Sequence, residues 1–315
     1  MNPALTIVVP LFNSAATLER LVSELSALKV DGGHELVLVN DGSRDDTVEV
    51  CERLMRTATV PVALVKLSRN FGEHHAVMAG LHHAAGDFIV TMDDDLQNPP
   101  SEVLKLFSHA CEGKQEVVYS YYDDKKHEGW RNFGSWLTNC VADFLLDKPK
   151  GLYLSSFRCM SAFVAKEICR YDGPFAYVDG LILQVTQSIG RVLVKHEERE
   201  EGRSGYTLRK LVKLWLNMFV NFSVIPLHLA TMLGFTMAAL GFIYTVAVIW
   251  ERLTKGTPLG WSSTMAALTV FSGTQLLVLG MAGEYIGRLY LTANKRPQFI
   301  VKEIVRSSPA GMNKP

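Results

Sequence analysis

The sequence predicts an α/β domain with a doubly wound, mainly parallel sheet, followed by an amphipathic interface helix and a two-helix transmembrane hairpin. Two observations lead to this prediction. Short β-branched runs alternate with amphipathic helical patterns over roughly the first 200 residues, and two long uncharged segments follow them. The expected boundaries are 1–206 for the α/β domain, 207–225 for the interface helix, 226–287 for the hairpin and 288–315 for a basic tail.

Short runs rich in Val, Ile and Leu have the length of buried strands. They lie at residues 5–9, 35–39, 62–67, 87–92 and 116–121. Amphipathic stretches at 16–28, 47–55 and 74–85 separate them and are typical of crossover helices. The alternation predicts a βαβ sheet with helices on both faces. Ligands bind such sheets beyond the carboxyl ends of the strands, so the residues after each run are candidates for a functional site.

The two apolar segments span residues 226–250 and 256–283, and neither contains Asp, Glu, Lys or Arg. A helix needs about 20 residues to cross the hydrocarbon core of a bilayer, and both segments are longer. Their many Gly, Ala, Ser and Thr residues allow close helix packing in a membrane. Two buried helices of a soluble bundle are the alternative interpretation, which the length of the segments disfavours.

The flanks of the hairpin predict its orientation. Lys and Arg cluster before residue 226 and after residue 287, whereas the loop between the spans carries only Arg252 and Lys255. The positive-inside rule then places the α/β domain and both termini in the cytoplasm. Residues 207–222 combine an apolar helical face with cationic residues, which favours a helix at the lipid headgroups or a connector packed on the domain.

Composition limits the partners of the chain. Its 315 residues contain 32 Lys or Arg and 32 Asp or Glu, so the net charge is zero and a nucleic-acid partner is disfavoured. With 48% hydrophobic residues, the chain has ample material for a core and is too apolar to be disordered. The mean hydropathy of +0.12 is high for a soluble domain and reflects the two apolar segments.

An acidic run follows the fourth predicted strand: Asp93, Asp94 and Asp95, with Gln97 two residues later. Residues two apart on a strand point to the same side, so Asp93 and Asp95 are expected to converge. Two hard oxygen donors at a strand end suit Mg²⁺ or Mn²⁺, which proteins commonly bind through one or two carboxylates plus substrate phosphates. The alternative is a solvated turn that caps a helix beginning near Ser101. No GxGxxG follows the first strand and no GxxxxGK[ST] occurs, which disfavours glycine-cradled phosphate sites.

Four ordered motifs carry a family resemblance, and they are IVVPLFN (7–13), VNDGS (39–43), LSRNFG (67–72) and MDDDLQNPP (92–100). Together they resemble the inverting family-two glycosyltransferases with the GT-A fold. The chain is more narrowly similar to the polyprenyl-phosphate glycosyltransferases, a group that includes dolichyl-phosphate mannose synthase and the bacterial undecaprenyl-phosphate glucosyl and aminoarabinose transferases. The resemblance extends through the hairpin to GEYIGR at 283–288.

The resemblance implies roles on the donor side of the site. It places Asp41 on the nucleobase of a nucleotide-sugar donor, Asp93 on its nucleotide portion, and Asp95 with Gln97 on a Mg²⁺ or Mn²⁺ ion at the diphosphate. The donor-binding residues it implies are Pro10, Asn13, Asp41, Ser68, Asn70, Asp93 and Asp94.

The resemblance also implies an acceptor side. Arg131, Arg199 and Ser204 are expected at the acceptor phosphate, and Arg131 and Arg158 join Asp93 and Asp95 as catalytic candidates. A planar guanidinium binds phosphate oxygens in bidentate fashion, which suits these arginines. The chain departs from the family pattern at Ser156, where many relatives have Asp or Gly, and at Gly205, where Lys is usual; both lie in the acceptor and sugar motifs.

The resemblance thus implies an enzyme of the bacterial inner membrane that moves one sugar from a nucleotide-sugar, commonly UDP-linked, to undecaprenyl phosphate for cell-envelope glycan or lipid modification. The implied assembly is a homotetramer. A lipid phosphate is already anionic at neutral pH, so no strong general base is required. Two alternatives are a processive polysaccharide synthase, whose Gln-x-x-Arg-Trp motif is absent, and a non-catalytic nucleotide-sugar-binding membrane protein.

Overall fold

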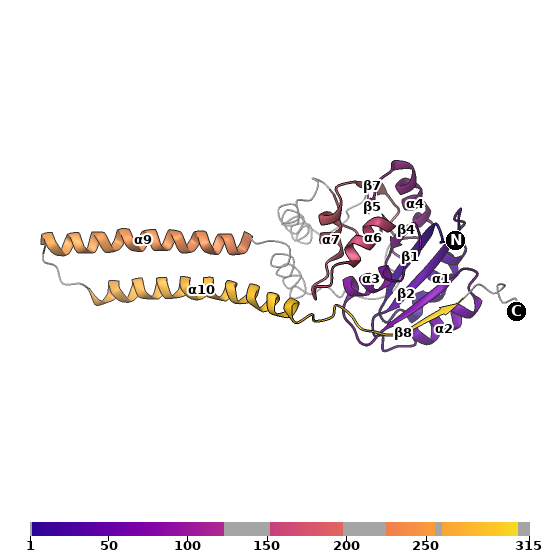
Figure 1. Ribbon diagram of the computed structural model, residues 1–315, viewed down its shortest axis with the longest axis horizontal. Helices are drawn as coiled ribbons and strands as arrows, with labels where there is room; N and C mark the ends of the chain where they lie inside the picture. Colours follow the sequence, from indigo (N-terminus) through magenta and orange to yellow (C-terminus); the bar gives the residue numbers. More distant parts are fainter. Residues whose placement is uncertain (1, 123–151, 198–224, 256–259, 308–315) are drawn as a thin grey trace. The chain divides into compact units, whose positions relative to one another are not determined.

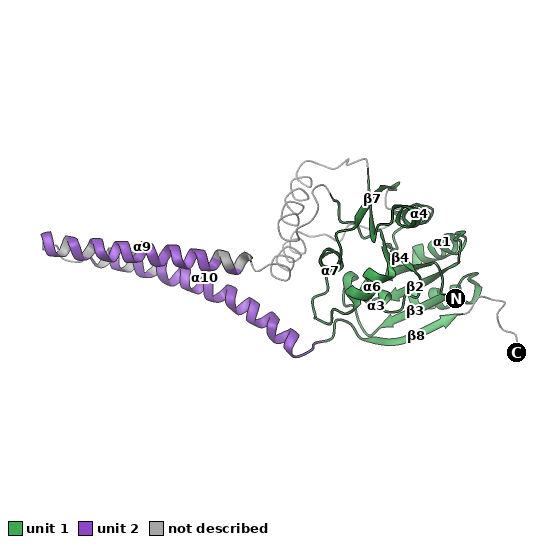
Figure 2. Ribbon diagram, turned by 45° about the horizontal axis from the view of Figure 1, so that its top comes forward, with its two compact units in different colours: residues 1–207, 297–315 green, residues 208–296 purple. Residues whose placement is uncertain are grey.

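The computed structural model describes residues 2–122, 152–197, 225–255 and 260–307. The chain divides into two compact units, one of residues 1–207 with 297–315 and one of residues 208–296 (Figure 2). The predicted interface helix at 207–225 lies almost wholly outside the described residues.

The first unit contains one sheet of eight described strands, in the order β7-β5-β6-β4-β1-β2-β3-β8 (Figure 1). Their bounds are β1 Leu5–Leu11, β2 His34–Asn40, β3 Val62–Leu67, β4 Phe88–Thr91, β5 Val117–Tyr121, β6 Arg158–Ser161, β7 Ile189–Leu193 and β8 Val301–Ser307. The central strands β3, β2, β1 and β4 are parallel, as are β5 and β7. β6 runs antiparallel to β4 and β5, and β8 runs antiparallel to β3 at the edge.

Helices cover both faces of this sheet, and their bounds are α1 Ala15–Ser26, α2 Thr47–Thr57, α3 Glu73–Leu81, α4 Glu102–Gly113, α6 Ala162–Cys169 and α7 Val178–Val185. Ile7 and Val9 of β1 join a core with α1, α2 and α4, whereas Val8 joins a second core with α3, α6 and α7. Successive strand residues face opposite sides, so a strand between two helical layers must be apolar throughout. This arrangement confirms the predicted doubly wound, mainly parallel fold.

The predicted strand runs correspond to β1 through β5, but the sequence reading did not identify β6, β7 or β8. The expected basic tail at 288–315 is divided differently in the structure, since helix α10 continues to Ala293 and residues 301–307 form β8. The charged residues Lys302, Glu303 and Arg306 interrupt the apolar pattern from which strands are predicted, so the sequence did not indicate β8. Such charges are usual on edge strands because they discourage pairing with other chains.

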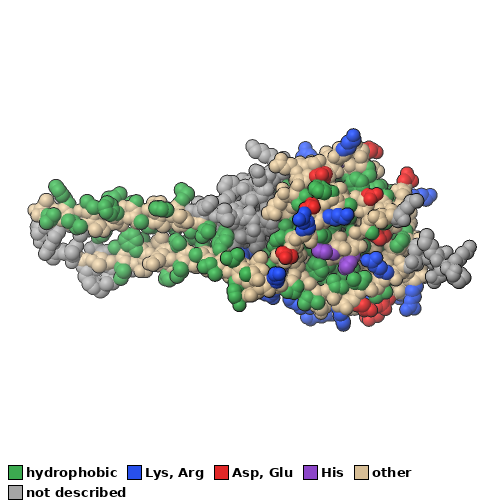
Figure 3. Space-filling view, in the orientation of Figure 1, with side chains coloured by type: hydrophobic (Ala, Val, Ile, Leu, Met, Phe, Trp, Pro, Cys, Tyr) green, Lys and Arg blue, Asp and Glu red, His purple; other side chains and the backbone are tan. Residues whose placement is uncertain are grey.

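The second unit contains the helices α9 (Ile225–Lys255) and α10 (Trp261–Ala293), which lie side by side in both ribbon views (Figures 1 and 2). They pack closely where a Cβ on Gly241 would lie 2.6 Å from the Phe271 ring. Many of their large apolar side chains are exposed, and hydrophobic atoms follow both helices on the face that Figure 3 shows.

The sequence predicted two membrane spans, whereas one helix among the described residues is long and apolar enough to cross a bilayer. It is α9, through Ala230–Ala247, with a mean hydropathy of 1.6. Helix α10 has the length, but Ser, Thr, Gln and Gly residues dilute its apolar side chains. The two-helix hairpin is therefore present, and only its first helix meets the compositional test.

Candidate functional site

The loops after β1 and β2 are tied together by Asn13 at the carboxyl edge of the sheet. Its backbone N–H donates to Ser43 Oγ at 3.0 Å, and its Oδ1 accepts from the Arg44 backbone N–H at 2.9 Å. Asn13 adopts a φ of 56°, a left-handed conformation that Asn tolerates better than most residues. Pro10 lies earlier, inside β1 and paired with Val39, where it is buried. Asn13 thus shapes the edge of the site, and Pro10 belongs to the strand beneath it.

Asp41 joins the loop after β2 to the start of α3. Its two carboxylate oxygens accept the backbone N–H groups of Phe71 at 2.7 Å and Gly72 at 2.8 Å. Burial raises the pKa of Asp41, and these two hydrogen bonds oppose that rise. The observed contacts of Asp41 are therefore with the backbone of the loop after β3, and its contact with a nucleobase stays a prediction.

Gly42 lets the loops after β2 and β3 touch. With a φ of +67°, it approaches the next loop so closely that an added Cβ would lie 2.6 Å from both the Arg69 carbonyl carbon and the Asn70 nitrogen. A side chain at this position would force the loops apart. The sequence motif at 39–43 thus positions the motif at 67–72.

A pocket of about 650 Å³ opens between these loops. Ser68 and Asn70, both predicted donor residues, line it together with Phe12. Lys302 and Glu303 of β8 also line it, and the sequence reading assigned neither to the site. The pocket therefore combines three strand-end loops with a strand that follows the hairpin.

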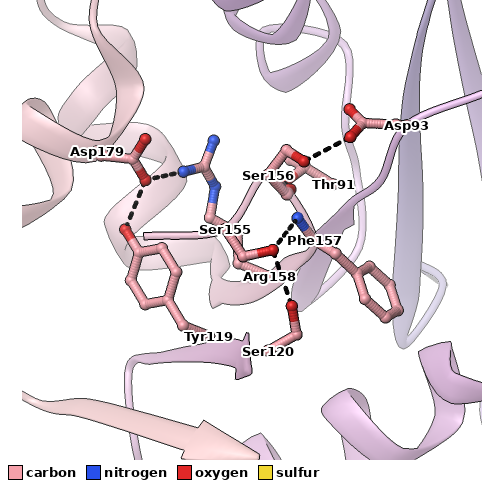
Figure 4. A network of polar contacts seen from close by, with 9 residues as sticks. All are labelled: Thr91, Asp93, Tyr119, Ser120, Ser155, Ser156, Phe157, Arg158 and Asp179. Carbon is pink, nitrogen blue, oxygen red and sulfur yellow. Dashed lines mark hydrogen bonds and ion pairs between the residues drawn. The ribbon is translucent and has the colours of Figure 1, made fainter. Parts of the chain in front are cut away.

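The acidic run at the end of β4 sends its carboxylates in different directions. Asp93 accepts from Ser156 Oγ at 2.6 Å (Figure 4), whereas Asp94 accepts from Ser14 Oγ and from the Phe12 backbone N–H. Asp95 accepts from the Gln97 backbone N–H at 3.2 Å. Asp94 thus holds the loop after β1 by hydrogen bonds to Phe12 and Ser14.

The turn that carries these carboxylates is held in an unusual conformation. Leu96 has a φ of 60°, which is rare for a residue of this size, while its side chain is buried in the core with α4. Such backbone strain persists only where the surrounding packing enforces it, and it is common at functional sites. Burial raises the pKa of Asp93 to about 6 against the opposing Ser156 hydrogen bond, and Asp95 and Asp94 add to the rise. A cation at this turn would relieve the crowding of negative charge.

Glu73, the first residue of α3, also belongs to this acidic group, although the sequence reading did not single it out. Glu73 is an exposed residue. Partial loss of solvation at its carboxyl group, followed by repulsion from Asp93, raises the pKa of Glu73. Its position directly after the motif at 67–72 was the one available signal in the sequence.

Arg158, a predicted catalytic candidate, is buried in an ion pair. The side chain is 2% exposed and forms an ion pair with Asp179 of α7, which also accepts from the Tyr119 hydroxyl at 2.9 Å (Figure 4). Two residues before Arg158, the carbonyl of Ser156 accepts from Thr91 Oγ1 at 2.7 Å, and the Ser156 hydroxyl donates to Asp93. Arg158 therefore anchors the strand that presents Ser156, and its guanidinium is enclosed within the protein.

The predicted acceptor residues, Arg131, Arg199 and Ser204, lie outside the described residues. Gln97 is half-buried, and its backbone carbonyl accepts from the Glu197 N–H at 2.8 Å. Within the described ranges, no group of three or more His, Cys, Asp or Glu side chains could hold a metal ion by itself. The predicted ligands Asp95 and Gln97 would need donor phosphates to complete a metal site.

Comparison with known proteins agrees with this geometry. Residues 6–168 match the family model described as "Glycosyl transferase family 2", and residues 225–289 match the one described as "GtrB C-terminal hairpin". The chain is 34% identical to an undecaprenyl-phosphate 4-deoxy-4-formamido-L-arabinose transferase of Pseudomonas savastanoi pv. phaseolicola, over 96% of this chain and 91% of the relative. It is 31% identical to the protein of the same description from Pseudomonas aeruginosa, over 98% and 92%.

Solved structures show the same fold at low identity. Glucosyl-3-phosphoglycerate synthase from Mycobacterium tuberculosis, in complex with phosphoglyceric acid, aligns with a TM-score of 0.51 and 19% identity over 69% of this chain and 80% of that one. Its complex with Mn²⁺, UDP-glucose and phosphoglyceric acid aligns with a TM-score of 0.50 and 19% identity over the same shares. With a matching family domain over more than half of its length, a matching hairpin and full-length relatives above 30% identity, the chain belongs to glycosyl transferase family 2 and carries a GtrB-type C-terminal hairpin.

Proposed function

We propose that this glycosyltransferase moves one sugar from a nucleotide-diphosphate donor to undecaprenyl phosphate, with inversion at the anomeric carbon. The observation that carries the proposal is the acidic turn at the end of β4, beside a nucleotide-sized pocket at the ends of β1, β2 and β3. The full-length similarity to undecaprenyl-phosphate transferases supports the acceptor.

Asp95 and Gln97 are our proposed protein contacts for a divalent metal ion. Their oxygens are hard donors of the kind that Mg²⁺ and Mn²⁺ prefer. Burial raises the pKa of the neighbouring Asp93, and the charges of Asp95 and Asp94 add to this rise. When bound, the ion would neutralise charge on the leaving diphosphate. UDP is our proposed nucleotide, and the Mn²⁺ and UDP-glucose bound to the fold relative support this choice.

In the proposed reaction, an oxygen of the lipid phosphate attacks the anomeric carbon as the bond to the diphosphate breaks. Attack from the face opposite the leaving group inverts the configuration and releases the nucleoside diphosphate. The phosphate is already an anion, so the chain needs only to position it. We assign this task to Arg131, Arg199 and Ser204, because guanidinium and hydroxyl groups donate to phosphate oxygens.

We further propose that the hairpin crosses the bacterial inner membrane twice, with the catalytic unit and both termini in the cytoplasm. The pairing of β8 with β3 supports this topology, since the chain before and after the hairpin then lies on one side of the membrane. The basic flanks favour the cytoplasmic side. By resemblance to its family, we propose a homotetramer. The sugar in the relatives' description, 4-deoxy-4-formamido-L-arabinose, is the first donor to examine.

The decisive variant is Asp95→Ala, compared with Asp87→Ala at the opposite end of β4. Asp87 is exposed and directly precedes β4, whereas the acidic turn follows it, so the Asp87 variant controls for loss of a carboxylate beside the same strand. Full-length protein, with Mg²⁺ or Mn²⁺ and a panel of UDP-sugars, should release UDP when undecaprenyl phosphate is present. We expect Asp95→Ala to reduce this rate by at least about 100-fold, the scale of a lost electrostatic contact in a transition state. An unchanged rate in Asp95→Ala would contradict the proposed metal site.

A further inference from the structure

The strand β8 enters the sheet at the edge of the donor pocket. It pairs antiparallel with β3, so its first residues lie beside the carboxyl end of β3. The carbonyl of Ile300 accepts the backbone N–H of Ser68 at 2.9 Å. The segment that follows the hairpin therefore supports the loop that carries the predicted donor residues Ser68 and Asn70.

The approach to β8 is also fixed to the first unit. Gln298 is buried and its Nε2 donates to the carbonyl of Tyr171, while the Phe299 ring packs edge-on against His82 with their centroids 5.6 Å apart. These contacts fix the segment that leads into β8, whose Lys302 and Glu303 line the pocket.

A β-bulge places Lys302 at the pocket. Lys66 pairs with Glu303 and Leu67 pairs with Val301, which leaves Lys302 as the extra residue between them. Val301 can then pack with Leu67 against the core beneath α3, while Glu303 still reaches Lys66. Bulges redirect side chains and are frequent beside active sites. Lys302 is exposed and lines the donor pocket.

The charges around Lys302 leave its ammonium group available. Glu303 is held by Lys66 Nζ at 3.0 Å, and the same Nζ binds Glu52 at 2.6 Å. Lys302 itself pairs with none of the acidic residues that the structure describes in residues 2–122, 152–197 and 260–307. It thus contributes a cation to the pocket wall that is not already committed to a carboxylate.

The pocket lining carries charges of both signs: Asp45, Glu49 and Glu303 are acidic, and Arg44, Lys66, Arg69 and Lys302 are basic. The choice of its occupant therefore follows from the position of the proposed metal site. The predicted metal residue Asp95 is absent from its lining. The diphosphate therefore belongs at the acidic turn after β4, and the base belongs between the loops after β2 and β3 and strand β8.

We infer that Lys302 is a specificity-determining residue of the donor site, which donates a hydrogen bond to O4 of uracil or O6 of guanine. A lysine ammonium group offers three donors and no acceptor. Cytosine and adenine carry an amino group at the equivalent position, and an amino group cannot accept this hydrogen bond. The inference rests on the proposed nucleotide-sugar donor and assigns part of its recognition to the strand after the hairpin.

The test is equilibrium binding of UDP, GDP, CDP and ADP to the full-length protein in detergent with Mg²⁺. We expect wild type to bind UDP or GDP more tightly than CDP or ADP. Lys302→Met should weaken binding of the preferred nucleotide about 10-fold, the size of a hydrogen bond to a charged group. The four nucleotides should then bind this variant with similar affinities. Lys302→Arg should keep the preference. Arg306→Met, an exposed cation on the same strand outside the pocket, is the matched control and should bind as wild type.

Steady-state kinetics separates recognition from damage to the fold. Lys302→Met should raise the KM for the donor and leave kcat and the melting temperature near wild type. Binding of UDP by wild type with the same preference in Lys302→Met would overturn this inference and leave the proposed function standing. If wild type binds none of the four nucleotides, the proposed donor is itself wrong and the role of Lys302 falls with it.

Discussion

Arg158 and Asp179 form a buried ion pair. This buried position gives Arg158 a structural role. The guanidinium lies beside the Tyr119 ring at 5.8 Å from its centroid, and the Asp179 carboxylate accepts from both side chains. A buried charge that loses its partner is far more costly than the same pair replaced as a whole by apolar groups. The sequence motif alone could not distinguish this arrangement from a phosphate contact, because both require an arginine at this point of the chain.

Variants of this pair can separate the two roles. Arg158→Met should destabilise the protein by ~3–5 kcal/mol, because Asp179 would remain buried and unpaired. The double variant Arg158→Met with Asp179→Leu should recover most of that stability, and with it most of the transferase activity. Chemical denaturation and activity measured on the same preparations would decide the matter. A double variant that is stable yet inactive would return Arg158 to a catalytic role.

His74 provides a pH-dependent test on the same side of the sheet. Its ring packs edge-on against Tyr177 with their centroids 4.9 Å apart, and burial lowers the pKa of His74 to about 4. The folded state therefore binds fewer protons at this residue than the unfolded chain does between about pH 6.5 and pH 4. The stability contributed at neutral pH is lost as the pH falls through this window.

Melting temperatures from pH 8 to pH 4 should show this loss in wild type and a weaker loss in His74→Phe, which keeps an aromatic ring against Tyr177. His109→Gln, on α4 at the opposite face of the sheet, is the control and should follow wild type. An equal slope in all three proteins would show that His74 does not contribute to acid sensitivity.

At the scale of elements, the strand-end loops form one structure because each holds the next. Asn13 binds the loop after β2, Asp41 binds the start of α3, and Gly42 permits direct contact with Arg69 and Asn70. The pocket therefore depends on backbone proximity as much as on the side chains that line it. A substitution at Gly42 should disturb donor binding without removing any polar group.

Gly33→Ala provides the matched control for Gly42→Ala. Both glycines have a positive φ, but an added Cβ at Gly33 meets nothing within 4 Å, whereas at Gly42 it meets the backbone of the neighbouring loop. Gly33→Ala should cost only the conformational strain of about 1–2 kcal/mol. Gly42→Ala should cost more and should also raise the donor KM several-fold. Equal stability and equal KM in the two variants would contradict the described loop contact.

The elements differ in how far the sequence could predict them. The strands β1 through β5 are continuous apolar runs, most of them enclosed between two helical layers, so their pattern is visible in isolation. The strand β6 is four residues long and begins with Arg158, β7 contains Gly190 and Arg191, and β8 contains several charges. These three segments form strands because they pair with neighbouring strands. A local sequence pattern does not reveal such pairing.

The same distinction applies to the site. The acidic turn and the residues Ser68 and Asn70 were predictable because they directly follow strands. The hydrogen bond between Ser156 and Asp93 joins residues 63 apart in the chain, and the pairing of β8 with β3 joins residues farther apart still. Contacts of this kind are products of the folded topology, so the contributions of Ser156, Glu73 and Lys302 became visible only in the structure.

At the scale of the whole molecule, the catalytic unit is assembled from both ends of the chain. Residues 1–207 and 297–315 form one unit, and the hairpin unit is inserted between them in the sequence. The chain that leaves the hairpin thus returns to the sheet and contributes to the donor pocket. Residues 297–300 thus connect the hairpin to strand β8, which lines the proposed donor pocket.

Transfer to a lipid phosphate can be tested with two lipids that differ only in that phosphate group. Full-length protein with Mn²⁺ and its cognate labelled nucleotide-sugar should be incubated with undecaprenyl phosphate or with undecaprenol, and label in the organic phase should be counted. We predict a lipid-linked sugar of inverted configuration with undecaprenyl phosphate and only background label with undecaprenol. Equal labelling of the two lipids, or nucleotide release that does not depend on either, would contradict transfer to the lipid phosphate.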